Sequence, residues 1–245
     1  MSIKTFELIS TTENNVELMS YIALPENASD SNSVAGILVA PEWWGLGDYT
    51  KSVVERLAEA GYAAVAMDIY GEGKLTSDAA QANIWMEQVL EDQDMLMARC
   101  RLILNDFSDQ LAVDGDNLGA IGYCLGGKIV LDMARDAMPL KAVATFHGNL
   151  SPKQPADKNF KAKVLVAHGS DDSMVSMDAI EGLKKELDAA DVDYTIDVYD
   201  GAKHGFTNPH ADEKAAKNDV DLGYNEAAAK QSWENMLEFM KTNLG

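Results

Sequence analysis

The 245-residue sequence predicts a single-domain α/β fold, with a mostly parallel central sheet, helices on both faces and an antiparallel hairpin at its N-terminus. Short, continuous apolar segments alternate with longer segments of helical periodicity, as in parallel sheets with helical crossovers. The first two strand-like segments, in contrast, are separated only by a polar turn. Because no repeat, low-complexity linker or change in composition divides the chain, we expect one domain spanning residues 1–245.

The N-terminal segment is expected to form the hairpin and then a strand–helix–strand unit. Residues 3–10 and 16–24 are strand-like and flank the turn-forming Glu13-Asn14-Asn15. Continuous apolar runs, typical of strands buried on both faces, follow at residues 34–40 and 62–67. Between these runs, residues 48–60 have the apolar spacing of an amphipathic helix that ends near Gly61.

The rest of the chain continues the alternation. Further strands are predicted at residues 118–123, 140–146, 163–168 and 194–199, and helices at 76–107 (with a break near 90–94), 127–138, 177–189 and 226–243. The acidic stretch 211–223 is expected to be a solvated loop. It does not match a calcium-binding loop, because Val220 and Leu222 fall where oxygen ligands would be needed.

The charge of the chain restricts its partners. The net charge is −20, from 40 acidic and 20 basic residues, so nucleic acid and anionic membrane surfaces are repelled and neither is expected as a partner. We attribute this charge to solubility, not to a cationic substrate. Two cysteines are too few for a disulfide framework, and neither a secretion signal nor a membrane-length apolar run is evident. We therefore expect a reduced, cytoplasmic protein, monomeric or a small homo-oligomer, that acts on a small molecule.

The segment Gly122-Tyr123-Cys124-Leu125-Gly126-Gly127 joins the strand of residues 118–123 to the following helix. Gly-x-Cys-x-Gly at a sharp strand-to-helix turn is the layout of a nucleophile elbow, in which glycines leave room for a strained central residue. Cys124 is therefore the candidate nucleophile. The amide of Leu125, at the start of the helix, is expected to stabilise an oxyanion, together with the amide of Trp43 from the loop after residues 34–40.

An acid and a base follow the next strands in the order that hydrolase triads use. Asp172 lies just beyond residues 163–168, with Asp171 as its rival, and His204 follows residues 194–199. The sequence thus predicts a Cys124–His204–Asp172 triad, in which histidine accepts the thiol proton and aspartate fixes the imidazole tautomer. A thiolate favours esters and lactones over amides, because amide leaving groups demand more activation.

Other ligand sites are not indicated. The glycines near Cys124 fit neither a dinucleotide loop nor a phosphate-binding loop, and the four histidines lack metal-ligand spacing, so no cofactor and no metal are expected. Trp44, Trp85, Tyr123 and Phe206 are predicted to contact the substrate. Core packing of Trp85 and support of the elbow by Tyr123 remain open alternatives.

The chain resembles the dienelactone hydrolases (carboxymethylenebutenolidases) over nearly its whole length. The matching segments are Pro41-Glu42-Trp43-Trp44-Gly45, Gly122 to Gly127, Gly169-Ser170-Asp171-Asp172 and His204-Gly205-Phe206. This resemblance implies an α/β-hydrolase fold and a Cys-His-Asp triad in which Glu42 is an accessory catalytic carboxylate that helps to deprotonate the nucleophile. The alternative for Glu42 is a loop carboxylate that caps a helix.

The chain departs from that family in the groups that hold a substrate carboxylate. Family members that act on dienelactone use arginines, one of them shortly after the histidine, whereas His204 to Pro209 and Leu75 to Glu87 contain none. Lys74 or Lys203 could substitute, without the bidentate geometry of arginine. A short-chain carboxylesterase, a thioesterase or acyltransferase with the same triad, and a non-catalytic binding protein remain as alternatives.

Overall fold

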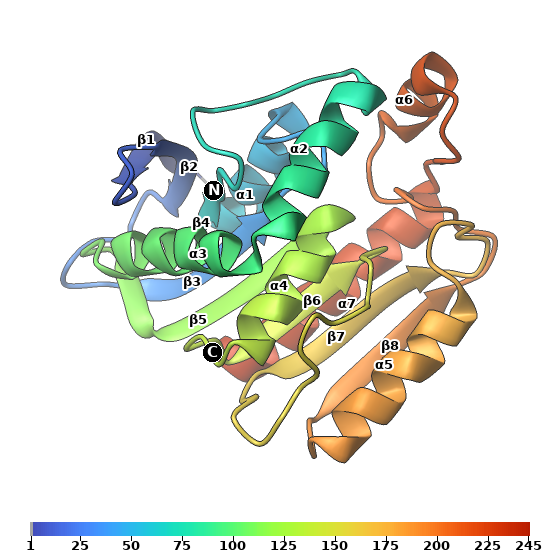
Figure 1. Ribbon diagram of the computed structural model, residues 1–245. Helices are drawn as coiled ribbons and strands as arrows, with labels where there is room; N and C mark the ends of the chain where they lie inside the picture. Colours follow the sequence, from blue (N-terminus) through green and yellow to red (C-terminus); the bar gives the residue numbers. More distant parts are fainter. Residues whose placement is uncertain (1) are drawn as a thin grey trace. The chain divides into compact units, whose positions relative to one another are not determined.

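The computed structural model describes residues 2–245, and the chain divides into two compact units, Met1–Ala120 and Ile121–Gly245. Each unit combines β-strands with α-helices (Figure 1). Strand β5 (Val113–Tyr123) begins in the first unit and ends in the second, immediately before Cys124. No helix in the described part of the chain is long and apolar enough to cross a membrane.

The first unit has the strand order β1-β2-β4-β3-β5. The N-terminal hairpin is antiparallel from Ile3 opposite Pro25 to Thr11 opposite Glu17, β2 pairs antiparallel with β4, and β3 pairs parallel with β4. In Figure 1, α3 lies in front of these strands and α1 behind them. The elements are β1 (Ile3–Thr11), β2 (Glu17–Pro25), β3 (Val34–Ala40), α1 (Asp48–Glu59), β4 (Ala63–Ala66), α2 (Ala79–Glu91) and α3 (Gln93–Ser108).

Asp92 separates α2 from α3, which explains the helix break that the sequence indicates near residues 90–94. It lies between the last residue of α2, Glu91, and the first residue of α3, Gln93, and its carboxylate accepts a hydrogen bond from the amide of Met95 in the first turn of α3, at 2.9 Å. An aspartate at this position satisfies an amide that has no partner inside the helix. The side chain therefore ends one helix and starts the next.

The second unit continues from the end of β5 in the order β5-β6-β7-β8. β6 and β7 pair in parallel, as do β7 and β8, and every residue of β6 is buried. In Figure 1, α4 and α5 lie in front of these strands and α7 behind them. The elements are α4 (Leu125–Arg135), β6 (Ala142–Phe146), β7 (Lys163–Gly169), α5 (Met177–Ala189), β8 (Tyr194–Tyr199), α6 (Ala211–Asn218) and α7 (Glu226–Leu244).

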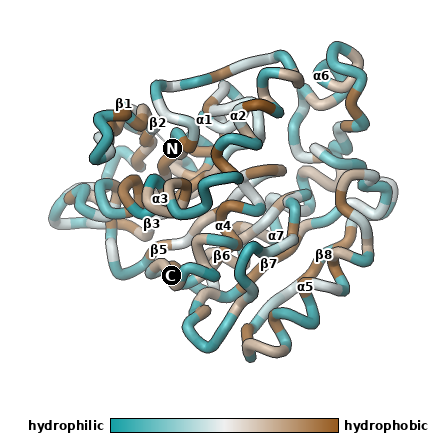
Figure 2. The backbone as a smooth tube through the Cα atoms, viewed as in Figure 1, coloured by the Kyte–Doolittle hydropathy of each residue, from teal (hydrophilic) through white to brown (hydrophobic). Residues whose placement is uncertain are grey.

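Helix α5 is held on the sheet by one apolar face. Its buried residues are Ile180, Leu183 and Leu187, which recur at helical spacing. Figure 2 shows the result as alternating hydrophobic and hydrophilic segments along this helix. The periodicity in the sequence is thus sufficient to place α5.

Helix α4, which begins immediately after Cys124, is fixed by a buried network of ion pairs. Arg135 donates two hydrogen bonds to Glu186 of α5, at 2.8 and 2.9 Å, and one to Asp132, at 2.9 Å. Lys128 bonds the other oxygen of Asp132 at 2.9 Å and the carbonyl of Ser151 at 2.8 Å. Because these side chains are nearly inaccessible to solvent, screening is weak and the network restrains the helix of the candidate nucleophile.

The structure confirms the predicted fold class, including the N-terminal hairpin and the parallel strand pairs that follow it. The predicted solvated loop at residues 211–223 is wrong in its first part, because α6 occupies Ala211–Asn218. Acidic residues in its first turn and Lys217 in its last turn complement the helix dipole, which favours a helix there. Strand β5 also begins at Val113, ahead of the predicted residue 118, because the polar Asp114-Gly115-Asp116-Asn117 masks the strand pattern.

Candidate active site

The backbone at Cys124 has the geometry of a nucleophile elbow. Cys124 lies between β5 and α4 with φ 54° and ψ −114°, a conformation that residues with a Cβ atom rarely adopt. Its amide donates to the carbonyl of Phe146 on β6 at 3.0 Å, which holds the turn in place. A Cβ atom on Gly122 would collide with the backbone carbonyl of Gly126, so only glycine allows this close approach. The half-buried Cys124 is therefore held in a strained turn.

Asp172 and His204 form a direct pair in the second unit. Asp172 lies beyond β7 and His204 beyond β8, and the Oδ2 atom of Asp172 is 2.9 Å from the Nδ1 atom of His204. The other carboxylate oxygen accepts hydrogen bonds from the amides of Met174 and Val175, both at 2.9 Å. Burial tends to raise the pKa of Asp172, but the His204 bond and these amides outweigh it and lower the pKa. The carboxylate is thus anionic and fixed in orientation.

Backbone contacts keep the loops that carry Asp172 and His204 together. The amide of Ser170 donates to the carbonyl of Tyr199 at 2.9 Å, and the amide of Asp171 donates to the carbonyl of Ala202 at 3.0 Å. A Cβ atom on Gly169 would collide with that same Ala202 carbonyl. This glycine therefore allows the two loops to approach closely enough for the Asp172–His204 bond.

Cys124 interacts with the remaining side of His204. Burial lowers the pKa of the imidazole, but electrostatic interaction with Cys124 and the hydrogen bond with Asp172 raise it to about 10. The buried Nε2 atom has no partner at hydrogen-bond geometry among the described residues, so the interaction with Cys124 is not a formed hydrogen bond in the free protein. Catalytic hydrogen bonds in free enzymes are often loose in this way and tighten on substrate binding.

His147 was missed as a site residue by the sequence reasoning, although it directly follows the buried strand β6. Its ring centroid lies 4.9 Å from that of His204, in an edge-to-face arrangement. The signal that could have found it is position, since polar residues just past the carboxyl ends of parallel strands gather at one edge of the sheet.

Leu125 is the first residue of α4, so its amide is among the groups at the helix N-terminus that have no acceptor inside the helix. This position suits the predicted role in an oxyanion hole. Tyr123 and Phe206, predicted to contact the substrate, are 2% and 0% exposed. The ring of Tyr123 packs on Phe146, and the ring of Phe206 packs on His147 and Tyr199. Substrate contact for these two rings stays a prediction.

Four further predicted site residues belong to the first unit. Glu42 follows β3 and is 7% exposed, so its carboxylate is buried. Trp43 and Trp44 are in ring contact at 4.9 Å, and Trp85 of α2 packs on Tyr70 at 5.6 Å. The roles of these residues toward Cys124, including the Trp43 amide in the oxyanion hole, stay predictions.

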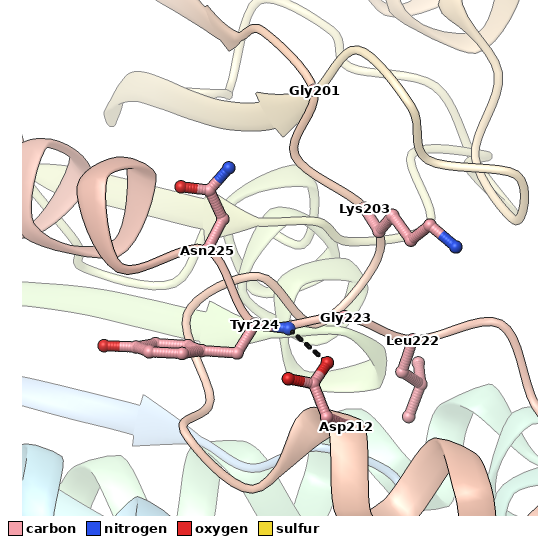
Figure 3. A pocket seen from close by; sticks show the side chains of 7 residues that line it. All are labelled: Gly201, Lys203, Asp212, Leu222, Gly223, Tyr224 and Asn225. Atoms are coloured by element: carbon pink, nitrogen blue, oxygen red, sulfur yellow. Dashed lines mark hydrogen bonds between the residues drawn. The ribbon is translucent and has the colours of Figure 1, made fainter.

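The two lysines suggested as carboxylate ligands each have an acidic partner. Lys203 lies 2.7 Å from Asp221 and Lys74 lies 3.1 Å from Glu72. Lys203 also lines a cavity of about 290 Å³, whose lining residues do not include the three candidate triad residues (Figure 3). In Figure 3 its side chain extends away from Tyr224 and Asn225.

Among the described residues, no group of three or more His, Cys, Asp or Glu side chains could hold a metal ion.

Comparisons with known proteins agree with this geometry. The model of the dienelactone hydrolase family matches residues 18–244. A Salmonella typhimurium protein, provisionally named a carboxymethylenebutenolidase, is 29% identical over 241 residues, covering 91% of this chain and 82% of that protein. The crystal structure of P91, a dienelactone hydrolase-like promiscuous phosphotriesterase from metagenomic libraries, superposes with a TM-score of 0.92 at 29% identity and covers 100% of both chains.

A more distant structure supports the fold alone. MGS-M1, an α/β-hydrolase enzyme from a deep-sea metagenome library, aligns with a TM-score of 0.74 at 14% identity over 99% of this chain and 98% of its own. The fold is therefore that of the α/β-hydrolases. The chain belongs to the dienelactone hydrolase family and is a carboxylic ester hydrolase.

Proposed function

We propose that the protein cleaves carboxylic esters or lactones through a thioester formed on Cys124, with His204 and Asp172 completing a catalytic triad. The observation that carries this proposal is the position of His204, which is bonded to Asp172 at 2.9 Å and interacts with Cys124 on its other side. Cys124 and Asp172 both favour the imidazolium form of His204, and an imidazolium beside Cys124 can stabilise the thiolate that attacks the substrate.

In the first half-reaction, the thiolate attacks the acyl carbon and a C–S bond forms. The carbonyl oxygen becomes an oxyanion, which the amide of Leu125 at the start of α4 is placed to stabilise. As the tetrahedral intermediate collapses, the C–O bond to the leaving group breaks. His204 gives its proton to the departing alkoxide, so an alcohol leaves and a thioester remains on Cys124.

In the second half-reaction, neutral His204 accepts a proton from water as the water oxygen attacks the thioester. The C–S bond then breaks, the carboxylic acid leaves, and the thiolate and imidazolium are restored. Asp172 stabilises the imidazolium in both steps and fixes its tautomer, because its second oxygen is held by two amides.

Glu42 is proposed as an accessory carboxylate that assists deprotonation of the nucleophile, and Trp43 as the second oxyanion donor. Supporting these roles are the resemblance of Pro41 to Gly45 to the family segment and the burial of the Glu42 carboxylate. Glu42→Gln should lower kcat while leaving the fold intact, since the amide is isosteric with the acid.

The preferred substrates are proposed to be neutral esters of short acyl chains. Lys203 is paired with Asp221 and Lys74 with Glu72, so neither lysine presents an uncompensated charge to a substrate carboxylate. Dienelactone carries such a carboxylate, and its recognition is best served by the bidentate geometry of arginine.

The test is hydrolysis of p-nitrophenyl acetate and butyrate beside a dienelactone, by wild type, Cys124→Ala and Cys124→Ser. The expected result is turnover of the simple esters, loss of turnover in Cys124→Ala, and weaker activity on the dienelactone. Undiminished turnover by Cys124→Ala would refute the mechanism. Formation of a new ester or thioester in the presence of a competing alcohol or thiol would instead identify an acyltransferase.

A second candidate activity is the hydrolysis of neutral phosphotriesters. The favouring observation is the likeness to P91, which is described as a promiscuous phosphotriesterase and covers 100% of this chain at 29% identity. Paraoxon in the same substrate panel tests it, with loss of turnover in Cys124→Ala as the required control.

A further inference from the structure

His147 is a buried histidine beside the candidate triad for which the proposed mechanism has no role. It is 1% exposed and follows β6 with φ 42°, in the left-handed region that residues with a Cβ atom rarely occupy. Strained backbone of this kind persists only where the surroundings enforce it, and it gathers at functional sites. The polar ring is thus held in the interior of the protein.

The ring of His147 packs against the loop that carries His204 and near Tyr123, the residue before Cys124. It meets His204 edge to face with centroids 4.9 Å apart, and it meets Phe206, from the same loop as His204, at 5.5 Å. Tyr123, the residue before the nucleophile, lies 6.1 Å away. His147 thus fills the space between the elbow and the loop that carries His204.

Thr207 gives this ring a fixed orientation. The Nε2 atom of His147 lies 3.0 Å from the hydroxyl of Thr207, which belongs to the His204 loop. An apolar ring of similar size would pack in the same space, but it could not be held at its far edge. The hydrogen bond therefore couples the orientation of His147 to the loop whose histidine it touches.

His147 is neutral in this environment. Burial lowers its pKa well below the usual value, and the positive charge of His204 and the imidazole of His168 on β7 lower it further. A second positive ring would repel the imidazolium of His204, whereas a neutral ring can support it. The other rings in contact, Tyr123 and Phe206, bring no charge to His147.

Building on the proposed ester chemistry, we propose that His147 is a positioning residue: tethered by Thr207, its ring holds the imidazole of His204 in line between Asp172 and Cys124. The Nε2 atom of His204 has no partner at hydrogen-bond geometry in the free protein, so the orientation of the ring determines how well it supports a thiolate on Cys124. Misplacement of a catalytic group by about 1 Å can reduce a rate by about 10²-fold.

Three variants test this inference: Thr207→Val, which is nearly isosteric and removes the tether; Thr207→Ser, which restores it; and His147→Asn, which removes the ring and tolerates a left-handed backbone. Thr195→Val, at an exposed position on β8, is the matched control. Two quantities are measured: kcat and KM for p-nitrophenyl acetate, and the pH dependence of Cys124 alkylation by iodoacetamide. The second reports the thiolate whether or not any ester is hydrolysed.

The expected result for Thr207→Val is a fall in kcat of about tenfold with KM nearly unchanged. The acid limb of the alkylation profile should move to higher pH by about half a unit or more, because a displaced imidazolium stabilises the thiolate less. Thr207→Ser should restore both values, and His147→Asn should show the larger effect.

An unshifted alkylation profile in Thr207→Val, with a native circular dichroism spectrum, would overturn the inference even if kcat falls. A shift that Thr207→Ser does not reverse would overturn it as well. If His147→Asn does not fold, the two Thr207 variants decide alone. If wild type hydrolyses none of the esters, the proposed function fails, while the alkylation profiles still decide the role of His147.

Discussion

Asp172→Asn separates the charge of the triad acid from its shape, and the structure fixes how the new amide must lie. In the wild type, one carboxylate oxygen accepts hydrogen bonds from the amides of Met174 and Val175, at 2.9 Å each, and the other faces His204 at 2.9 Å. The oxygen of an asparagine side chain would keep the two amide donors. Its NH₂ group would therefore face the Nδ1 atom of His204.

In this orientation, the NH₂ group of the new asparagine and the Nδ1–H group of the His204 imidazolium would both be hydrogen-bond donors facing each other. His204 can accept a hydrogen bond from the amide only if Nδ1 is unprotonated. The proton of the neutral ring then lies on Nε2, which can no longer accept a proton from Cys124 or water. A hydrogen bond to a charged group is worth about 1.5–3 kcal/mol. Its loss corresponds to a fall of about one to two units in the pKa of His204.

We expect kcat/KM for p-nitrophenyl acetate to fall by about 10²- to 10⁴-fold in Asp172→Asn, with the fold unchanged. The pKa of His204 is followed by NMR in the same variant. Asp171→Asn is the matched control, because Asp171 is the exposed neighbour, bonded to Ser170 at 3.0 Å. An Asp172→Asn enzyme within tenfold of wild type, or an equal loss in Asp171→Asn, would refute this account of the acid.

Three further predictions follow from the same geometry. Because the pKa of His204 is raised from 6.5 to about 10, its contribution to stability is fully present below pH 6.5 and is lost as pH rises through about 10. We expect kcat/KM to fall over the same alkaline range. In Cys124→Ala, NMR should show a lower pKa for His204. An alkaline limb near pH 7 would contradict this. In thermal denaturation, Gly122→Ala should unfold the protein or lower its Tm markedly, because the new Cβ atom would collide with the Gly126 carbonyl. The control is Gly182→Ala on α5, where a Cβ atom meets open space, and it should raise stability by about 0.4–1 kcal/mol. Equal effects of the two variants would show that the elbow is not tightly packed. Arg135→Met leaves Glu186 buried without its cation and Asp132 paired with Lys128 alone, and it should cost about 3–5 kcal/mol in urea denaturation. A cost below about 1 kcal/mol would show that water reaches these carboxylates.

The strands and long helices could be predicted because the spacing of their apolar residues shows which positions are buried. β3 and β6 are continuous apolar runs, and α5 carries its buried residues at helical spacing. The start of β5 could not be predicted in this way, because residues Asp114 to Asn117, none of them buried, extend the strand without any apolar signal. α6 was missed for a related reason, since Ala211 is its one buried residue and charge placement, not burial, supports it.

The candidate site was predictable where a motif fixes the backbone. The glycines around Cys124 and the order of Cys124, Asp172 and His204 along the chain carry enough information to expect these residues together. His147 carries no such motif. Its importance depends on contacts with Thr207 and His204, which are distant in sequence. It also depends on a left-handed backbone conformation, which a histidine in the sequence does not predict.

The most direct test of the central claim is intact-mass spectrometry of the protein, acid-quenched during turnover of p-nitrophenyl acetate. The account predicts a fraction of wild type that is heavier by one acetyl group, mapped by peptide analysis to Cys124 and removed by hydroxylamine as a thioester. Asp172→Asn should accumulate the same adduct more slowly, and Cys124→Ala should show none. Turnover without an adduct on Cys124 in wild type, or with the acetyl group on another residue, would contradict the account.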